Sequence, residues 1–269
     1  QHNSSNFSGT RLFPHNQVVR RSLPYAFLNR FLKIKKSTNS FEAYIWADTI
    51  IDIHGINFVS KEPFVSSIII PGVIILIAKI LNKKIIKFTQ SFGPIEGFFH
   101  NLVSKFFLQY ADLIIPREPN SEEQLKQLGI KNYVSYRTDS AFNLHSSDFR
   151  SDFIQQDSNR IKMGFCLSAT SAVKSEMYEV QAKNLIEALS NQYDIYLFAH
   201  YSSPGSKKER DLLVQSNNLD ENLVNKIFDS FNGHKGIYKI PPFSSPDQVK
   251  GAIKSFDILI SSRYHACIA

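Results

Sequence analysis

Arg263 and His265 stand two residues apart in the motif SSRYHA, directly after the short apolar run Ile258–Ile260. The guanidinium of an arginine can bind a phosphate or a carboxylate through two parallel hydrogen bonds. A histidine two residues later can donate or accept a proton near neutral pH. A structural interpretation is equally open, in which Arg263 pairs with an acidic neighbour and His265 caps a helix. The motif is therefore the strongest candidate for chemistry, but its spacing does not decide between the two.

Arg117 is a second candidate for anion binding, because it follows the apolar run Leu113–Ile115 and precedes a segment with helical spacing. The backbone N–H groups at the start of a helix attract anions, and an arginine beside them adds a full positive charge. The alternative is a structural region formed by Arg117 and Glu118. Chemistry alone gives these two interpretations about equal weight.

Four more residues follow predicted strands and could line a ligand. Ser91 and Gly93 lie in the motif QSFGP, where a plain turn is the favoured interpretation. His54 and Gly55 lie in the motif DIHG, where the glycine permits close approach of the backbone to a bound molecule. His200 also follows a predicted strand, but a lone histidine there is more often structural. Each of these signals is weak by itself.

Short apolar runs alternate with helical segments along the chain, which predicts a parallel sheet with helices on both faces. In open α/β sheets, ligands bind outside the carboxyl ends of the strands, and most of the candidates above follow such ends. The expected strands are Ile50–Ile53, Ile85–Thr89, Leu113–Ile115, Tyr133–Tyr136, Met163–Leu167, Ile195–Ala199, Gly236–Ile240 and Ile258–Ile260.

Apolar residues at three- and four-residue spacing predict the helices between these strands. Ser121 and Gln124 match a capping box at the start of one helix, and Gly129 is a typical C-terminal stop. The longest apolar stretch has 11 residues, whereas a membrane span needs roughly 20, so we expect a buried helix there. The expected helices are Ile68–Ala78, Phe98–Gln109, Ser121–Leu128, Met177–Ser190 and Ser245–Lys254.

The segment between His145 and Asn159 is rich in Ser, Asp and Gln and lacks apolar periodicity, as linkers do. We therefore expect two domains, residues 1–144 and 161–269, joined by a linker at 145–160. Residues 207–221 and 241–246 are expected to be loops or solvated segments.

Composition and missing motifs exclude several classes of protein. The chain has 269 residues, a formal net charge of +7 and two cysteines, which excludes a disulfide framework and a four-cysteine zinc site. It lacks the glycine-rich dinucleotide motif, the Walker A loop, HExxH, GxSxG and any Asp-x-Asp pair. We predict no essential metal, no nucleic-acid partner and, without an export signal, a cytoplasmic location. The positive charge favours anionic ligands or an anionic membrane surface without choosing between them.

Taken in order, several motifs resemble the polysaccharide pyruvyl transferase family. They are ADTIIDIHGIN at 47–57, QSFGP at 90–94, ADLIIPREPNSEEQLKQLGI at 111–130, TDSAF at 138–142, KMGFCLS at 162–168 and FDILISSRYHA at 256–266. The resemblance covers nearly all of the chain from about residue 42, and the order of the motifs is more specific than any one of them.

This resemblance implies transfer of pyruvate from phosphoenolpyruvate to two hydroxyls of a sugar in a polysaccharide or its lipid-linked precursor, forming a cyclic ketal. It also implies two Rossmann-like domains with parallel sheets, similar to the two-domain (GT-B-like) glycosyltransferases. Arg263 then looks like the donor-binding arginine, His265 like the general acid, and Arg117 like a second arginine facing the donor. No cofactor beyond the donor substrate is expected.

The sequence departs from the family pattern in three places. A glycine-rich Asn-x-Gly-Asp turn is expected near the start of the family, and Asn6–Gly9 is a poor match for it. Paired glycines are common where this chain has His54 and Gly55. The chain also stops at Ala269, just after SSRYHA, so we expect an incomplete, C-terminally truncated second domain.

Two other functions remain open at this stage. One is a glycosyltransferase of the same two-domain shape that uses a nucleotide sugar. The other is a carbohydrate-binding or assembly protein that has kept the fold and lost catalysis. Competition among phosphoenolpyruvate, a nucleoside diphosphate and a glycan would separate the three. The acceptor sugar and the oligomeric state are not encoded in any motif, although peripheral association with a membrane would suit a lipid-linked acceptor.

Overall fold

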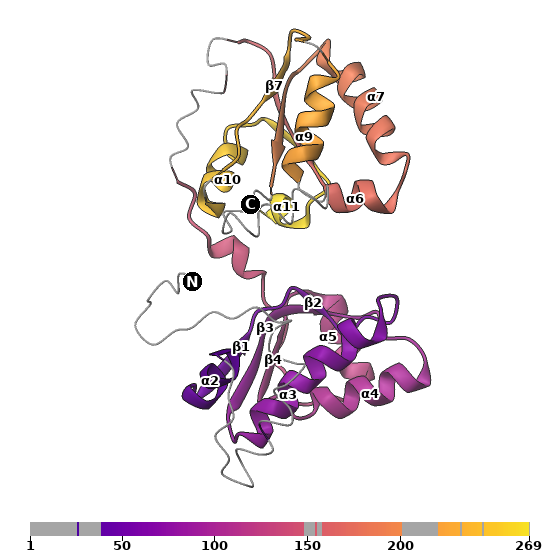
Figure 1. The fold of residues 1–269 in the computed structure, drawn as a ribbon, viewed down its shortest axis with the longest axis vertical. Helices are drawn as coiled ribbons and strands as arrows, with labels where there is room; N and C mark the ends of the chain where they lie inside the picture. The colour runs from indigo at the N-terminus through magenta and orange to yellow at the C-terminus, as the bar shows by residue number, and fades with distance from the viewer. Residues whose placement is uncertain are drawn as a thin grey trace. The chain divides into compact units, whose positions relative to one another are not determined.

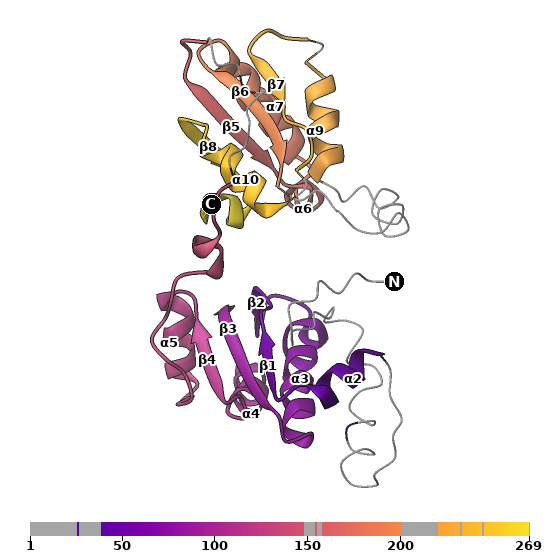
Figure 2. The same ribbon diagram turned by 90° about the vertical axis from the view of Figure 1, so that its left-hand side faces the viewer.

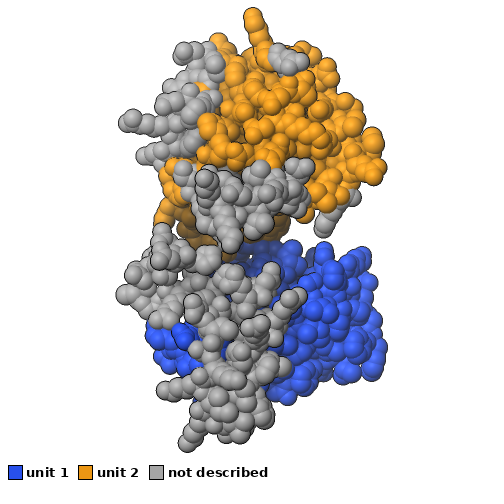
Figure 3. Space-filling model, in the orientation of Figure 1, with its two compact units in different colours: residues 1–139 blue, residues 140–269 orange. Residues whose placement is uncertain are grey.

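A computed structural model describes residue 26 and residues 39–147, 154, 158–200, 220–231, 233–243 and 245–268. The chain divides into two compact units, residues 1–139 and 140–269 (Figure 3). Within the described residues, each unit contains a four-stranded parallel sheet. This confirms the expected α/β fold with two Rossmann-like parts. The expected turn at Asn6–Gly9, much of the expected linker and the expected loop at 207–219 lie outside the described residues.

In unit 1 the sheet centres on β3, which pairs in parallel with β1 and β2 along one edge and with β4 along the other (Figures 1 and 2). Its main apolar cluster takes side chains from β3 and β4 together with α3, α4 and α5, and a smaller cluster holds Phe41 of α2 and Ile77 of α3. The elements are α2 Asn39–Trp46, β1 Thr49–Asp52, β2 Ile56–Asn57, the π-helix Val65–Ile69, α3 Ile70–Ile80, β3 Lys84–Phe92, α4 Phe98–Leu108, β4 Leu113–Pro116 and α5 Pro119–Gln127.

In unit 2 the strand order is β7-β6-β5-β8, with every pair parallel. Side chains alternate along β5 and β6, so Phe165 and Leu197 pack against α7 and α9, whereas Cys166 and Phe198 pack against α10 and α11. Helices therefore cover both faces of this sheet. The elements are the 3-10 helix Ser140–Asn143, β5 Lys162–Leu167, α6 Ala169–Lys174, α7 Tyr178–Ser190, β6 Asp194–Ala199, α9 Asp220–Asp229, β7 Ile237–Lys239, α10 Pro246–Ile253, β8 Ile258–Ser261 and α11 Tyr264–Ile268.

Three local expectations need correction. Tyr133–Tyr136 forms a single bridge between Tyr133 and Ile114 rather than a strand, because the Tyr136 N–H donates to the Glu122 carboxylate instead of to a neighbouring strand. Residues 220 and 221, expected in a loop, begin α9. A helix, α11, follows the segment expected to form the last one.

The predicted capping box of α5 is also wrong. The helix begins at Pro119, after an extended Glu118, so Ser121 lies inside the helix. The Ser121 hydroxyl accepts a hydrogen bond from the Phe92 N–H at 2.8 Å, and Gln124 Oε1 accepts one from the Ile95 N–H at 2.8 Å. These two side chains tie α5 to the loop that leaves β3. The predicted stop at Gly129 is confirmed, since its φ is +69°.

The boundary between the units falls five residues before the start of the expected linker. The 3-10 helix Ser140–Asn143 belongs to unit 2, where the Lys250 ammonium donates to the carbonyl oxygens of Ala141 and Phe142 at 3.4 and 3.3 Å. Among the described residues, no helix is long and apolar enough to cross a membrane.

Replacing Gly72 by Ala should destabilise unit 1. A Cβ at this position of α3 would overlap the ring of Phe107 on α4, and that ring is buried in the core. Overpacking of this kind costs about 1–3 kcal/mol, more than the helix propensity gained by removing a glycine. Urea denaturation measures the change, and a variant as stable as the parent would contradict the close packing of α3 on α4.

Candidate active site

Ser91, Arg117 and Gly55 meet at the carboxyl edge of the sheet in unit 1. The Arg117 Nε donates to the Ser91 hydroxyl at 2.6 Å, and the Ser91 N–H donates to the Gly55 carbonyl at 3.0 Å. A Cβ added to Gly55 would lie 3.9 Å from Nη1 of Arg117. Three of the residues singled out from sequence are thus in contact, because Ser91 lies at the carboxyl end of β3 and Gly55 and Arg117 follow β1 and β4, which end at the same edge.

Arg117 forms a buried ion pair with Asp139, with Nη1 and Oδ2 at 2.8 Å. The two side chains are 4% and 8% exposed, so the pair is shielded from water. Glu118, the structural partner considered from sequence, instead accepts a hydrogen bond from the Ser121 hydroxyl at 2.9 Å. The charge of Arg117 is therefore balanced inside unit 1 by a residue of the TDSAF motif.

A buried ion pair between Lys87 and Asp52 lies next to the turn that carries His54. Lys87 Nζ lies 2.6 Å from Asp52 Oδ2, and the other Asp52 oxygen accepts from the His54 N–H at 2.9 Å. Gln90 Nε2 donates to the Asp52 carbonyl at 2.6 Å. Partial desolvation lowers the pKa of His54, the charge of Lys87 lowers it further, and that of Asp52 opposes both. The ion pair thus fixes the turn that carries His54 and Gly55.

Gly93 allows the backbone conformation of the loop after β3. Its φ of +86° lies in the left-handed region, and a Cβ there would come within 2.8 Å of the Gln124 side chain. A glycine is therefore required by conformation and by space.

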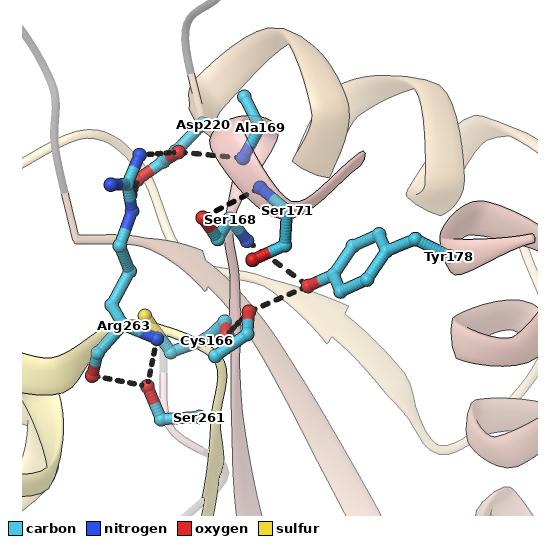
Figure 4. Close-up of polar contacts among 9 residues, drawn as sticks. Cys166, Ser168, Ala169, Ser171, Tyr178, Asp220, Ser261 and Arg263 are labelled. Atoms are coloured by element: carbon cyan, nitrogen blue, oxygen red, sulfur yellow. Dashed lines mark hydrogen bonds and ion pairs between the residues drawn. The ribbon is translucent and has the colours of Figure 1, made fainter. Parts of the chain in front are cut away.

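In unit 2, Arg263 binds Asp220 at the start of α9 (Figure 4). Its Nε donates to Asp220 Oδ2 at 2.8 Å, and its Nη2 contacts Oδ1. The Asp220 side chain is fully buried and also accepts from the Ala169 N–H at 2.8 Å. Asp220 thereby joins the turn after β5 to the turn after β8 and orients the arginine. The acidic partner weighed from sequence for Arg263 exists, but it lies 43 residues away.

Tyr178, at the start of α7, also joins the turn after β5 to the turn after β8 (Figure 4). The Tyr178 hydroxyl lies 2.6 Å from the Ser262 hydroxyl and accepts from the Ser168 N–H at 3.1 Å. The Ser262 N–H donates to the Cys166 carbonyl at 3.1 Å. Burial raises the pKa of the Cys166 thiol to about 12, so Cys166 is not a thiolate nucleophile at neutral pH.

A pocket of about 420 Å³ opens among these turns. The rings of His200 and His265 lie in it with their centroids 6.3 Å apart and their planes at 25°. Burial lowers the pKa of His200, as do the charges of His265 and Arg263, while Asp220 opposes them. The pocket is lined by Ser168, Thr170, Ser171, His200, Ser262, Arg263, Tyr264 and His265.

This pocket combines groups with complementary chemistry. Arg263 can bind an anion, the imidazoles can transfer a proton, and the hydroxyls can accept or donate hydrogen bonds to a sugar. His265 is the second residue of α11, so its role as a helix cap considered from sequence does not apply. Sequence reasoning thus found Arg263 and His265 but not Asp220 or Tyr178.

A second pocket, of about 490 Å³, lies at the amino ends of the strands of unit 2. Its arginine, Arg160, caps the C-terminal end of α7 by donating to the carbonyls of Ser190 and Tyr193, and it also pairs with Asp194. The guanidinium there serves the fold, so we assign this pocket no part in the chemistry.

The fold and the pocket define a class: a Rossmann-like α/β protein with cationic and hydroxyl side chains at the carboxyl ends of parallel strands. Within that class the chain belongs to the polysaccharide pyruvyl transferase family, whose model matches residues 10–269. The expected family resemblance is confirmed by this match.

Other comparisons are more distant. No curated protein matches the chain. Among solved structures, UDP-GlcNAc 2-epimerase from Methanocaldococcus jannaschii is similar at 11% sequence identity and a TM-score of 0.45. The alignment covers 87% of this chain and 65% of that chain, so this chain spans less than two thirds of that protein's length.

Proposed function

We propose that the protein transfers pyruvate from phosphoenolpyruvate to a sugar of a polysaccharide or of its lipid-linked precursor, forming a cyclic ketal. The family match over residues 10–269 carries this proposal. The pocket that holds Arg263 and His265 supports it, because its side chains match the charge of the donor and the hydroxyls of the acceptor.

Donor binding falls to Arg263 in this proposal. Phosphoenolpyruvate carries about three negative charges at neutral pH, and the positive charge of an arginine neutralises them better than an uncharged hydrogen-bonding group can. Asp220 holds the guanidinium through Nε and Nη2. The Arg263 side chain is 27% exposed and lines the pocket, so its guanidinium can donate a further hydrogen bond to an anion.

His265 is the proposed general acid. Its proton goes to the methylene carbon of phosphoenolpyruvate, while one sugar hydroxyl forms a bond to the central carbon. The bond from that carbon to the phosphate oxygen then breaks, phosphate leaves with its electron pair, and the second hydroxyl closes the ketal. The two hydroxyl protons go to His265 and to phosphate, so atoms and charge balance without a metal or another cofactor.

We also propose that the reaction takes place in the cytoplasm at a membrane surface, where a lipid-linked acceptor would be held. The net charge of +7 supports contact with an anionic surface.

Calorimetric titration with phosphoenolpyruvate tests the donor. Replacing Arg263 by Ala should weaken binding about 10- to 100-fold, as expected for losing a charge-assisted hydrogen bond. Because this change leaves the buried Asp220 without its cation, Arg263→Lys is titrated alongside; it keeps the charge and loses the planar fork. Arg137→Ala is the matched control, since the Arg137 guanidinium contacts backbone carbonyls on the surface of unit 1. Equal affinity in all four proteins would refute the proposed role of Arg263.

A further inference from the structure

Asp220 holds the guanidinium of Arg263 along one edge (Figure 4). Its Oδ2 accepts a hydrogen bond from Nε at 2.8 Å, and its Oδ1 contacts Nη2. A guanidinium is planar and has a second edge, formed by Nη1 and Nη2, that can donate two parallel hydrogen bonds to a carboxylate or a phosphate. Among the described residues the structure shows no partner for Nη1 of Arg263. The second edge is therefore the part of this arginine that remains for a ligand in the pocket.

The orientation of the Asp220 carboxylate is fixed by more than the arginine. The side chain is fully buried, and Oδ1 also accepts a hydrogen bond from the Ala169 N–H at 2.8 Å. Asp220 is the first residue of α9, and Ala169 begins α6 shortly after the end of β5. Two parallel hydrogen bonds keep the guanidinium and the carboxylate close to one plane. The fold thus sets the direction of the second edge of Arg263 before any ligand binds.

The charge of Asp220 opposes anion binding. The carboxylate neutralises Arg263, and like charges a few ångströms apart repel each other. Its field reaches the other pocket residues, because it opposes the lowering of the His200 pKa by burial, His265 and Arg263. A pocket that relied on charge alone would bind anions better without this carboxylate. What the carboxylate contributes is a fixed guanidinium, which removes the side-chain ordering that binding would otherwise require.

We propose that Asp220 is a positioning residue that limits Arg263 to its Nη1–Nη2 edge, so that the pocket binds a ligand through two oxygens of one carboxylate or phosphate group. This role rests on the proposed function for its ligand, because phosphoenolpyruvate carries both groups. It leads to an expectation that charge alone does not give. Removing the negative charge of Asp220 should weaken the binding of an anion.

Calorimetric titration of Asp220→Asn with phosphoenolpyruvate tests this role. The amide oxygen stays where two N–H groups converge on Oδ1, so the amide NH2 faces the Nε–H of Arg263, donor against donor. We expect the affinity to fall about tenfold, the effect of losing one charge-assisted hydrogen bond that orders the guanidinium. Without a positioning role, the added positive charge would raise the affinity instead.

Asp194→Asn is the matched control. Asp194 is also buried in unit 2 and paired with an arginine, with its Oδ1 3.3 Å from Nη1 of Arg160. It is the first residue of β6 and lies at the amino ends of the strands, whereas the pocket of Arg263 lies at their carboxyl ends. Urea denaturation should show a loss of stability in both variants, and only Asp220→Asn should lose donor affinity.

NMR of the arginine side chains reports the state of the guanidinium directly. The Nε–H signal of Arg263, assigned with Arg263→Lys, should exchange slowly with water in the parent and in Asp194→Asn, because Asp220 accepts its hydrogen bond. In Asp220→Asn the signal should broaden or disappear, since that hydrogen bond is lost. A merely structural role would lower the stability without this selective change.

Three results would overturn the positioning role. They are an affinity for phosphoenolpyruvate in Asp220→Asn that equals or exceeds that of the parent, an equal loss of affinity in both variants, and an unchanged Nε–H signal in Asp220→Asn. Titration with inorganic phosphate keeps this role separate from the proposed function. A parent that binds phosphate but not phosphoenolpyruvate refutes the transfer reaction, and weaker phosphate binding in Asp220→Asn then still supports the positioning role. A parent that binds neither anion refutes both.

Discussion

Replacing His265 by Gln should lower kcat by about 10²- to 10⁴-fold, the usual contribution of a positioned general acid, with little change in the affinity for phosphoenolpyruvate. Glutamine keeps a hydrogen-bonding side chain of similar reach but cannot donate a proton to carbon. Phosphate release in the presence of acceptor measures kcat, and calorimetry measures donor affinity.

His200 provides the matched control for this prediction, because its ring lies 6.3 Å from that of His265 in the same pocket. Burial, His265 and Arg263 lower the pKa of His200, which keeps its imidazole neutral at neutral pH. We therefore expect His200→Gln to reduce kcat by no more than about tenfold. A larger loss in His200→Gln than in His265→Gln would assign the acid to His200 instead.

Replacing Lys87 by Met should cost about 3–5 kcal/mol of unfolding free energy, because it leaves the charge of Asp52 buried without its partner. Lys87 is fully buried, and its ammonium lies 2.6 Å from Asp52 Oδ2 and 5.4 Å from the ring centroid of Phe58. Urea denaturation measures the loss. The double variant Lys87→Met/Asp52→Asn should recover part of it, since the uncompensated charge is then removed.

Lys79 offers a comparison at the surface of the same unit. Its ammonium lies 2.6 Å from Asp112 Oδ1, but both side chains are about one third exposed. Exposed pairs contribute about 0–1 kcal/mol, so Lys79→Met should have a small effect. Equal losses in the Lys79 and Lys87 variants would show that burial of the Lys87–Asp52 pair is not what stabilises the turn before His54.

Most of the fold could be predicted from the alternation of apolar runs and helical segments. Strands β5 and β6 are buried on both faces and appear as nearly continuous apolar runs, which is the pattern of a parallel sheet. Tyr133–Tyr136 has the same local pattern but is not a strand, because the Glu122 carboxylate on α5 binds the Tyr136 N–H. Such competition between a side chain and the hydrogen bonds of a sheet depends on tertiary contacts, so a short window of sequence does not reveal it.

Some of the pocket residues could be predicted from the sequence and others could not. Arg263 and His265 could be found because both follow a predicted strand within one short motif. Asp220 could not, because it is 51 residues from Ala169 and 43 from Arg263, and its two contacts depend on the order β6-β5-β8. Lys87 carried a usable signal, since a lysine within a buried strand requires a buried counter-charge, and the motif DIHG begins with one.

In the proposed function, the pocket of Arg263 and His265 takes phosphoenolpyruvate rather than a nucleotide sugar. Its most direct test is NMR of the histidine ring signals, assigned with His200→Gln and His265→Gln, during competition between the two ligands. We expect phosphoenolpyruvate to shift the signals of both rings in a saturable manner, and we expect a uridine diphosphate sugar neither to shift them nor to displace the donor. Saturable shifts with the nucleotide sugar and none with phosphoenolpyruvate would contradict it.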